Sequence, residues 1–386
     1  MRRFLSILAL AIAFVGFAFP PAASAQIDDG FPPHGRSRSV EARVITVERD
    51  WTVDEKRQMI FRAVDETGAE YRVDTTEGYV EGLRYDVKRG TRVILEVNEG
   101  PEGDVEAFLA DVVRTRGLLG VFLIFCALVV AVGYWRGLFA LAGLGLTLGI
   151  LFAFVFPRIL AGGNPLLTTA VGGVIILAVN MHLSHGFSRR TFVAFLSTFG
   201  GLLVALLASV VFVKFAFLSG LASEEANFLF WRFGSTAYPQ GILLAAMLLG
   251  AIGVLDDIAV TQTETVAELK HANPALTSRD LYTRAMRVGR HHIASTVNTL
   301  VLAYVGVSMP LFLLFLSMPD ITVSQFLNTE QVAEEIVRTL AGTSALILTV
   351  PLATWLAALT ARGDAGWLEE GKGGGHGPHH AHVHGA

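Results

Sequence analysis

The run Gly117-Leu-Leu-Gly-Val-Phe-Leu-Ile-Phe-Cys-Ala-Leu-Val-Val-Ala-Val-Gly-Tyr134 contains no charged residue from end to end. A helix needs about 20 predominantly apolar residues to cross the hydrocarbon core of a bilayer. This run therefore predicts a membrane-spanning helix, and it divides the chain into two parts. The residues before it are mixed in polarity, whereas the residues after it form further runs of the same kind.

The later runs predict a mainly α protein, a polytopic transmembrane bundle of about seven spans over residues 117–360. The predicted spans are Gly117–Tyr134, Gly137–Pro157, Pro165–Leu183, Thr191–Val213, Pro239–Leu255, Ile293–Ser317 and Ile336–Leu359. The segment Phe215–Phe233 is interrupted by polar residues and favours an external loop or an interfacial helix. Composition agrees with a membrane protein, because only 17% of the residues are charged, against about a quarter in soluble domains.

The amino terminus has the pattern of an export signal. Arg2 and Arg3 precede an apolar stretch, and Ala23-Ser-Ala25 fits the small-residue cleavage rule. We expect a signal peptide over residues 1–25, with an uncleaved anchor helix as the alternative. The only cysteine, Cys126, excludes an intramolecular disulfide, and the net charge of −4 gives no argument for a nucleic-acid partner.

A small β domain is predicted between a linker at residues 26–39 and the first span. Alternating polarity and turn residues predict short strands, which are Val40–Val47, Gln58–Val64, Glu70–Asp74 and Arg92–Val97. Several short strands at this spacing indicate a small barrel, SH3-like or OB-like, over residues 40–113. It holds no cluster of catalytic residue types, so we expect a binding or gating module.

The distribution of Lys and Arg predicts the orientation. Cytoplasmic loops carry an excess of these residues, and here the excess falls in alternate loops, at Arg136, Arg189, Arg190, Lys270, Arg279, Arg284, Arg287, Arg290 and Arg362. The barrel and the loop 215–238 are therefore expected outside, and residues 264–291 and the carboxyl terminus inside. The protein is expected in a bacterial inner or plasma membrane.

The most informative polar segment follows the fifth span, where the chain passes through Asp256 and Asp257. A polar stripe continues at i, i+4, i+7 and i+11, formed by Asp257, Thr261, Glu264 and Glu268, which share one helix face. A carboxylate near membrane depth is costly and by default functional. We expect Asp257 to be a coupling carboxylate; the alternative is a head-group position with a salt bridge to Arg290.

A matching polar set opens the next span and completes the predicted relay or cation site. Its members are Arg290, His291, His292, Thr296 and Asn298. Carboxylates and imidazoles that meet at one membrane edge are the composition of a proton relay or an ion site. We expect Pro239–Leu255 and Ile293–Ser317 to be neighbours that form a mobile core, with Asn298 in contact with the carboxylate end.

Two further groups of polar residues stand apart from this site. A secondary cluster, Asn180, His182 and His185, closes the third span. The tail over residues 361–386 is rich in Gly and His, with His376, His379, His380, His382 and His384 at irregular spacing. Such a tract can capture a divalent metal, and an unstructured cytoplasmic end is the alternative.

Several blocks of the sequence resemble the YibE/F family. They are His185-Gly-Phe-Ser188, Arg190-Thr191, Gly250-Ala-Ile-Gly253, Asp256-Asp257, Asn273-Pro274, Gly289-Arg290, Asn298-Thr-Leu300, Ala303-Tyr304 and Asn328. The resemblance extends from about Val40 to Leu359 and implies a multispanning bacterial membrane protein and a permease. A looser likeness links the Gly-rich helix, the Asp pair and the following helix to a segment of SecF and the resistance-nodulation-division exporters.

Two function classes remain open at this point. The first is a permease coupled to protons or an ion gradient, in which Asp257→Asn abolishes transport without unfolding the protein. The second is a non-transporting envelope scaffold whose outer barrel recruits a protein partner. An enzyme is not expected and no cofactor is expected, because the sequence has no nucleophile–base spacing, HExxH helix or nucleotide loop. A pure anchor has no need for Asp257, His292 and Asn298, which favours transport.

Overall fold

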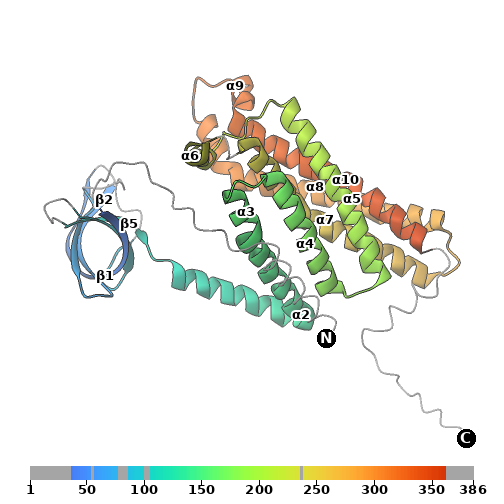
Figure 1. The fold of residues 1–386 in the computed structure, drawn as a ribbon, viewed down its shortest axis with the longest axis horizontal. Coiled ribbons are helices and arrows are strands. Elements are labelled where there is room, and N and C mark those ends of the chain that lie inside the picture. The colour runs from blue at the N-terminus through green and yellow to red at the C-terminus, as the bar shows by residue number, and fades with distance from the viewer. Residues whose placement is uncertain (1–35, 54–55, 77–85, 100–104, 235–237, 362–386) are drawn as a thin grey trace, which may run out of the picture. The chain divides into compact units, whose positions relative to one another are not determined.

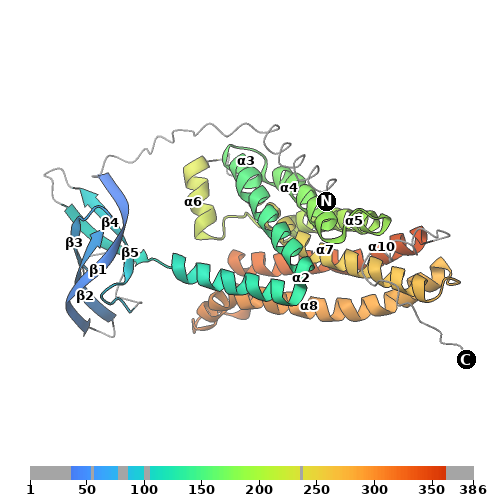
Figure 2. The ribbon, with the colours of Figure 1, turned by 90° about the horizontal axis from the view of Figure 1, so that it is seen from below.

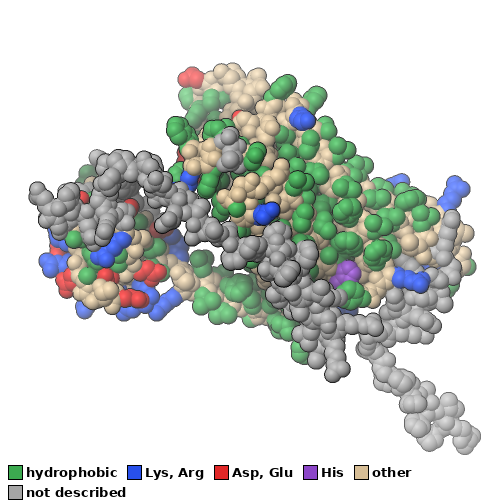
Figure 3. All heavy atoms as spheres, viewed as in Figure 1, with side chains coloured by type: hydrophobic (Ala, Val, Ile, Leu, Met, Phe, Trp, Pro, Cys, Tyr) green, Lys and Arg blue, Asp and Glu red, His purple; other side chains and the backbone are tan. Residues whose placement is uncertain are grey.

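A computed structural model describes residues 36–53, 56–76, 86–99, 105–234 and 238–361. The described chain forms two compact units, one up to Val132 and one from Gly133 onward, and each is described by itself. The predicted signal peptide and the His-rich tail from residue 362 lie outside the described residues. In Figure 3, acidic and basic side chains gather on the first unit, whereas apolar side chains cover most of the visible face of the second.

The first unit is built on a closed five-stranded barrel (Figure 1). Its strands are β1 (Arg36–Val53), β2 (Lys56–Asp65), β3 (Glu70–Asp74), β4 (Arg92–Glu99) and β5 (Val105–Val112). Their order around the barrel is β1-β2-β3-β5-β4, with β3 and β5 parallel and the other pairs antiparallel. Alternate residues point inward and form an apolar core that includes Met59, Phe61, Val73 and Leu95.

The predicted barrel is confirmed, and its number of strands agrees with an OB-like barrel. Two details of the prediction were wrong. β1 begins at Arg36, which pairs with Glu99, so residues 36–39 belong to a strand and not to a linker. β5 was missed, because its acidic residues and single Phe give a weak strand signal. β5 closes the barrel between β3 and β4.

Six helical segments are long and apolar enough to cross a membrane. The elements are α2 (Thr115–Ile150), η1 (Leu151–Val155), α3 (Phe156–Leu160), α4 (Pro165–His185), α5 (Arg189–Phe215), α6 (Glu224–Phe233), α7 (Pro239–Ala272), α8 (Ser278–Leu316), α9 (Val323–Asn328) and α10 (Glu330–Thr360). The bundle agrees with the predicted spans from Pro165 onward. α6 lies in the segment predicted as an external loop or an interfacial helix, and its Trp231 side chain is 86% exposed.

The first helical segment accounts for the difference between six segments and seven predicted spans. It runs from Thr115 to Leu160 over 46 residues, which is about 69 Å at 1.5 Å per residue. That length is more than twice the roughly 30 Å of a hydrocarbon core. Tyr134, the last residue of the first predicted span, interrupts it with φ 49° and ψ −130°. The segment therefore supplies two spans joined at Tyr134.

The centre of the bundle is formed by α5, α7 and α10, which pack on one another. α4 packs on α7, and α8 packs chiefly on α10; Figure 2 shows α7, α8 and α10 side by side. Glycines permit these close approaches, because a Cβ on Gly201 of α5 would overlap the Thr349 side chain of α10, and one on Gly173 would overlap Ile252.

Candidate functional site

Asp256 and Asp257 lie on α7, and the structure separates their environments. Asp257 is exposed. Asp256 is half-buried, and its Oδ1 is buried without a hydrogen-bond partner. The neighbouring residues Leu255 and Ile258 are fully buried in the bundle, so the packing of α7 holds Asp256 where it is. The carboxylate with the unusual environment is therefore Asp256 and not Asp257, which the sequence favoured.

Asn180 of α4 has a second buried oxygen without a partner, and its hydrogen bonds fix the orientation of its amide. Its Nδ2 donates to the Thr147 hydroxyl at 2.9 Å, and that hydroxyl donates to the Gly143 carbonyl at 2.9 Å. Because Thr147 uses its one hydrogen on Gly143, it can only accept from Asn180. The amide nitrogen therefore faces Thr147, and Asn180 Oδ1 is a buried acceptor with no donor.

The contacts between α4 and α7 place these two oxygens at a similar level. Pro165 lies against Gly241 and Gly173 lies against Ile252, so the two helices run in the same direction. Asp256 is one turn beyond Ile252, and Asn180 is about two turns beyond Gly173, which places it on nearly the same side of α4 as Gly173. Measured from the contact between Gly173 and Ile252, Asn180 is seven residues along α4 and Asp256 is four residues along α7. Their levels therefore differ by three residues, or about 4.5 Å along the helices. Carboxylate and amide oxygens are ligands for a hard cation and acceptors for a proton.

The polar stripe on α7 is confirmed as one face, but that face is open. Thr261, Glu264 and Glu268 line one shallow groove. Glu264, which lines this groove, forms an ion pair with Arg190 of α5 at 3.6 Å. Instead of meeting a partner helix, as expected for a membrane-embedded relay, the stripe is accessible on the surface of the described bundle.

The predicted partners on α8 do not reach the carboxylates. Arg290, His291 and Asn298 are exposed, and His292 and Thr296 are half-buried. Asn298 forms no described hydrogen bond with Asp256 or Asp257, so its predicted contact was wrong. The apolar stripe of α8, Ile293, Val297 and Leu300, packs on Ile258 of α7 and on Leu346 and Val350 of α10. That packing turns Asn298 away from α7.

The residues of the secondary cluster, Asn180, His182 and His185, do not form one site. Asn180 joins Thr147, whereas His182 Nδ1 lies 2.7 Å from the Ala178 carbonyl of its own helix. The His182 ring packs on Phe187 with 4.6 Å between centroids, and His185 is exposed. Within the part of the chain that the structure describes, no three His, Cys, Asp or Glu side chains are grouped to hold a metal ion.

Sequence reasoning missed a polar junction of three helices. Gln262 of α7 is 0% exposed, and its Oε1 lies 2.9 Å from the Thr354 hydroxyl of α10. Gly289 of α8 lies against the same amide, since a Cβ there would be 3.1 Å from Gln262 Oε1. One signal was available in the sequence. Thr261, Gln262 and Thr263 are three consecutive polar residues, and consecutive residues of a helix point in different directions, so at least one of them is expected to face the helix interface.

A buried acidic group on α10 was also missed, because its segment was assigned to an outer loop. Glu334 is 8% exposed and its Oε1 has no partner, although Arg338 lies 4.0 Å away. Arg338 also pairs with Glu335. Tyr304 of α8 lies near this group, and the charges of Arg338 and Glu335 act on its hydroxyl.

These features define a multi-pass helical membrane protein that carries a small β-barrel before its bundle. The profile of the YibE/F-like protein family matches residues 121–363, and the chain belongs to that family. The match covers the bundle and begins after the barrel, whereas the sequence resemblance was expected from about Val40. No curated protein and no solved structure matches the chain.

Proposed function

We propose that the chain is a permease coupled to a proton or cation gradient, and that Asp256 and Asn180 form its coupling site. The observation that carries this proposal is the buried Asp256 Oδ1 without a partner, within a helix of transmembrane length. A buried carboxylate is costly unless a proton, a cation or a donor compensates it. Asn180 adds a second uncompensated oxygen on the helix packed alongside.

The arrangement around these oxygens suits a site that is filled and emptied. Thr147 and Gly143 hold the Asn180 amide in one orientation, so the amide cannot turn its nitrogen toward the carboxylate to satisfy it. A proton or a small cation with oxygen ligands would satisfy both acceptors. In the proposed orientation the barrel is outside, and the end of α7 at Lys270 is cytoplasmic, as the distribution of Arg and Lys favours.

The test uses the purified full chain in liposomes that contain a pH-sensitive dye. An imposed pH gradient, and separately Na⁺ and K⁺ gradients, are applied while the internal pH is recorded. Wild type is expected to dissipate the pH gradient or to couple proton movement to a cation gradient. Asp256→Asn is expected to reduce the flux to that of protein-free liposomes, because the amide keeps the size and loses the titratable charge.

Asp257→Asn is the matched control, since it removes the same charge one residue away from an exposed position. It is expected to retain flux. Gly143→Ala is expected to lower flux as well, because a Cβ on Gly143 would lie 3.0 Å from Asn180 Oδ1 and displace it. Loss of flux in Asp257→Asn with flux retained in Asp256→Asn would contradict the site. A well-folded wild type that moves neither protons nor cations would contradict transport and favour the scaffold.

A further inference from the structure

The barrel carries a small charged pocket that the proposed transport site does not involve. Its volume is about 280 Å³, near the lower end of the roughly 300–1,000 Å³ of small-molecule pockets. The lining residues are Glu41, Ala42, Arg43, Val64, Asp65, Glu66 and Arg92. They come from β1, from the end of β2 with its turn, and from the first residue of β4. A pocket of this size accepts a ligand of a few heavy atoms.

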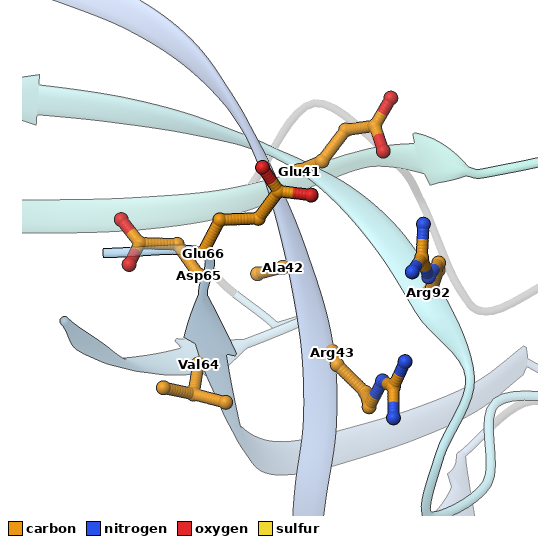
Figure 4. Close-up of a pocket in the computed structure, with 7 residues that line it drawn as sticks. All are labelled: Glu41, Ala42, Arg43, Val64, Asp65, Glu66 and Arg92. Carbon is orange, nitrogen blue, oxygen red and sulfur yellow. The ribbon is translucent and has the colours of Figure 1, made fainter. Parts of the chain in front are cut away.

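Two arginines in this pocket are placed directly opposite each other. Arg43 of β1 and Arg92 of β4 are cross-strand partners in an antiparallel pair, so their side chains extend from the same face of the sheet. Figure 4 shows both guanidinium groups on one side of the pocket. Like charges directly opposite each other destabilise a sheet, and among the described residues neither arginine forms an ion pair.

Three other arginines of the barrel are paired with acidic side chains. Arg57 is paired with Asp50 at 2.6 Å and with Asp86 at 3.0 Å. Arg62 and Arg72 share Glu48, at 2.5 and 3.4 Å. Unlike charges thus compensate these arginines, whereas among the described residues Arg43 and Arg92 form no ion pair, so this pair of like charges is open to an anionic ligand.

The remaining charges of the pocket are acidic. In Figure 4 the carboxylates of Asp65 and Glu66 lie on the side opposite the two guanidinium groups, and Glu41 lies above Arg92. Asp65 is already occupied, because it accepts from Thr67, Ala69 and Tyr71. Glu41 and Glu66 form no described hydrogen bond or ion pair. The pocket thus offers two free cations and two free carboxylates, which fit a small zwitterion.

The pocket is close to the point where the chain enters the membrane. The Val113 amide donates to the Arg92 carbonyl at 3.0 Å, and α2 begins two residues later at Thr115. The exposed apolar side chains of α2 begin at Leu118. Gly117 is four residue steps along the chain from Val113, a reach of at most about 14 Å. Arg92 is therefore held near the head-group layer, where phosphodiesters are concentrated.

We propose that this pocket binds the phosphoethanolamine head group of a membrane phospholipid. Arg43 and Arg92 would hold the phosphate with charge-assisted hydrogen bonds, as arginine forks do. Glu41 and Glu66 would accept from the primary ammonium. A choline head group fits less well, because quaternary ammonium groups are recognised by aromatic cages and no aromatic side chain is among the described residues that line the pocket.

The test measures binding to the full chain in phospholipid-free detergent. Glycerophosphoethanolamine, glycerophosphoglycerol, glycerophosphocholine and inorganic phosphate are titrated by calorimetry. Wild type is expected to bind glycerophosphoethanolamine tightest. The double variant Arg43→Gln/Arg92→Gln is expected to bind at least about tenfold more weakly, because it removes the charged hydrogen bonds from both guanidinium groups to the phosphate. The control Arg62→Gln/Arg72→Gln removes the same charge from the same barrel and is expected to bind as wild type.

Further variants separate the two halves of the ligand and the two sources of phosphate. Glu66→Gln is expected to remove the preference for glycerophosphoethanolamine over glycerophosphoglycerol. Arg43→Lys/Arg92→Lys keeps the charge, and provides a folded variant with weakened binding if the glutamine variant does not fold. Native mass spectrometry is expected to show phosphatidylethanolamine retained by wild type and lost from the double variant. Equal affinity for inorganic phosphate would overturn the head-group assignment. No head-group binding by wild type would overturn the proposal and favour a protein partner.

Discussion

The barrel and the bundle of this protein keep their polar groups in opposite places. In the barrel the fully buried side chains, such as Met59, Phe61 and Leu95, are apolar, and charged side chains lie outside, mostly in pairs. Among the described barrel residues, the buried hydroxyl of Thr75 accepts from the Met59 amide at 2.8 Å. In the bundle the polar side chains Ser197, Thr198, Gln262, Thr349 and Thr354 are all 0% exposed.

The difference follows from the solvent that each unit meets. Water drives apolar residues together in the barrel, because burial removes apolar surface from water. Lipid is as apolar as the helices, so helices associate through close packing and polar contacts instead. The bundle accordingly places hydroxyls and glycines where helices cross, and leaves Asp256, Asn180 and Glu334 with buried oxygens that have no partner. Buried polar oxygens of this kind can bind a proton or a cation, whereas the apolar interior of the barrel stabilises its fold.

The largest effect is expected from Gly201→Ala, which tests close packing in the bundle. A Cβ at Gly201 would overlap Thr349 Oγ1 and lie 3.2 Å from its Cβ, so α5 and α10 must separate. Overpacking of this kind costs about 1–3 kcal/mol, and we expect the upper end of that range. The measurement is the thermal midpoint of the full chain in detergent.

The glycine at position 145 provides the matched control, because a Cβ there meets no described atom within 4 Å. Gly145→Ala is expected to leave the midpoint unchanged. The double variant Gly201→Ala/Thr349→Ala is expected to recover most of the loss, since it removes Oγ1 and Cγ2, the two atoms of Thr349 that lie nearest to the new methyl group. Equal midpoints for Gly201→Ala and Gly145→Ala would show that α5 and α10 are not held by this contact.

The fold could be predicted from the sequence because its signals are local. Apolar runs predicted the helices, and the break at Tyr134 coincides with the end of the first predicted span. Alternation predicted four of the strands that form the barrel. β5 could not be predicted with the same ease, because Val105–Val112 contains two acidic residues. The place of β5 depends on its pairing with β4 and with β3. Its contact with β3 forms only when the barrel closes.

The candidate site could be predicted only in part, because burial depends on which helix packs where. The spacing on α7 correctly placed Thr261, Glu264 and Glu268 on one face, but it could not show that this face is open. Asp256 is half-buried because other helices pack on α7, and the contact of Asn180 with Thr147 joins residues 33 apart. Neither contact leaves a periodic trace in the sequence.

A smaller effect is expected from Thr354→Val, which tests the buried polar junction. The Thr354 hydroxyl lies within hydrogen-bond distance of Gln262 Oε1 and of the Val350 carbonyl, and its one hydrogen can serve only one of them. Valine removes the remaining partner of Gln262, and an unsatisfied buried amide costs about 1–3 kcal/mol. We expect a lower thermal midpoint, at the lower end of this range because Gln262 Nε2 already lacks a partner.

The double variant Gln262→Leu/Thr354→Val removes both polar groups and is the informative control. Replacing both partners by apolar groups of similar shape is nearly neutral or stabilising, so the double variant is expected to equal or exceed the stability of Thr354→Val. A double variant that is much less stable than Thr354→Val would show that Gln262 stabilises the junction through contacts other than this hydrogen bond.

The smallest effect is expected on the barrel surface, where charges are already compensated. Arg57 donates to Asp50 at 2.9 Å and to Asp86 at 3.0 Å. The hydrogen bond from Arg57 lowers the pKa of Asp50, and hydrogen bonds from Lys88 and then Arg57 lower the pKa of Asp86. A carboxyl group whose pKa is lower in the folded state stabilises that state above its unfolded pKa. This stabilisation is lost as the pH falls from that value through the folded pKa.

The thermal midpoint of the barrel should therefore stay constant from pH 7 to about pH 5 and fall below about pH 4, near the ordinary pKa of aspartate. Arg57→Gln is expected to lower the midpoint slightly at pH 7 and to make the fall below pH 4 shallower. Without Arg57 the pKa values of Asp50 and Asp86 in the folded state lie closer to their unfolded values, so protonation of these carboxylates removes less stability. Arg49→Gln removes a charge that stacks on Trp51 and should leave the pH dependence as in wild type. The measurement is near-ultraviolet circular dichroism of the full chain between pH 3 and pH 7. A steeper acid transition in Arg57→Gln than in wild type would show that the pairing with Arg57 does not set the acid stability of the barrel.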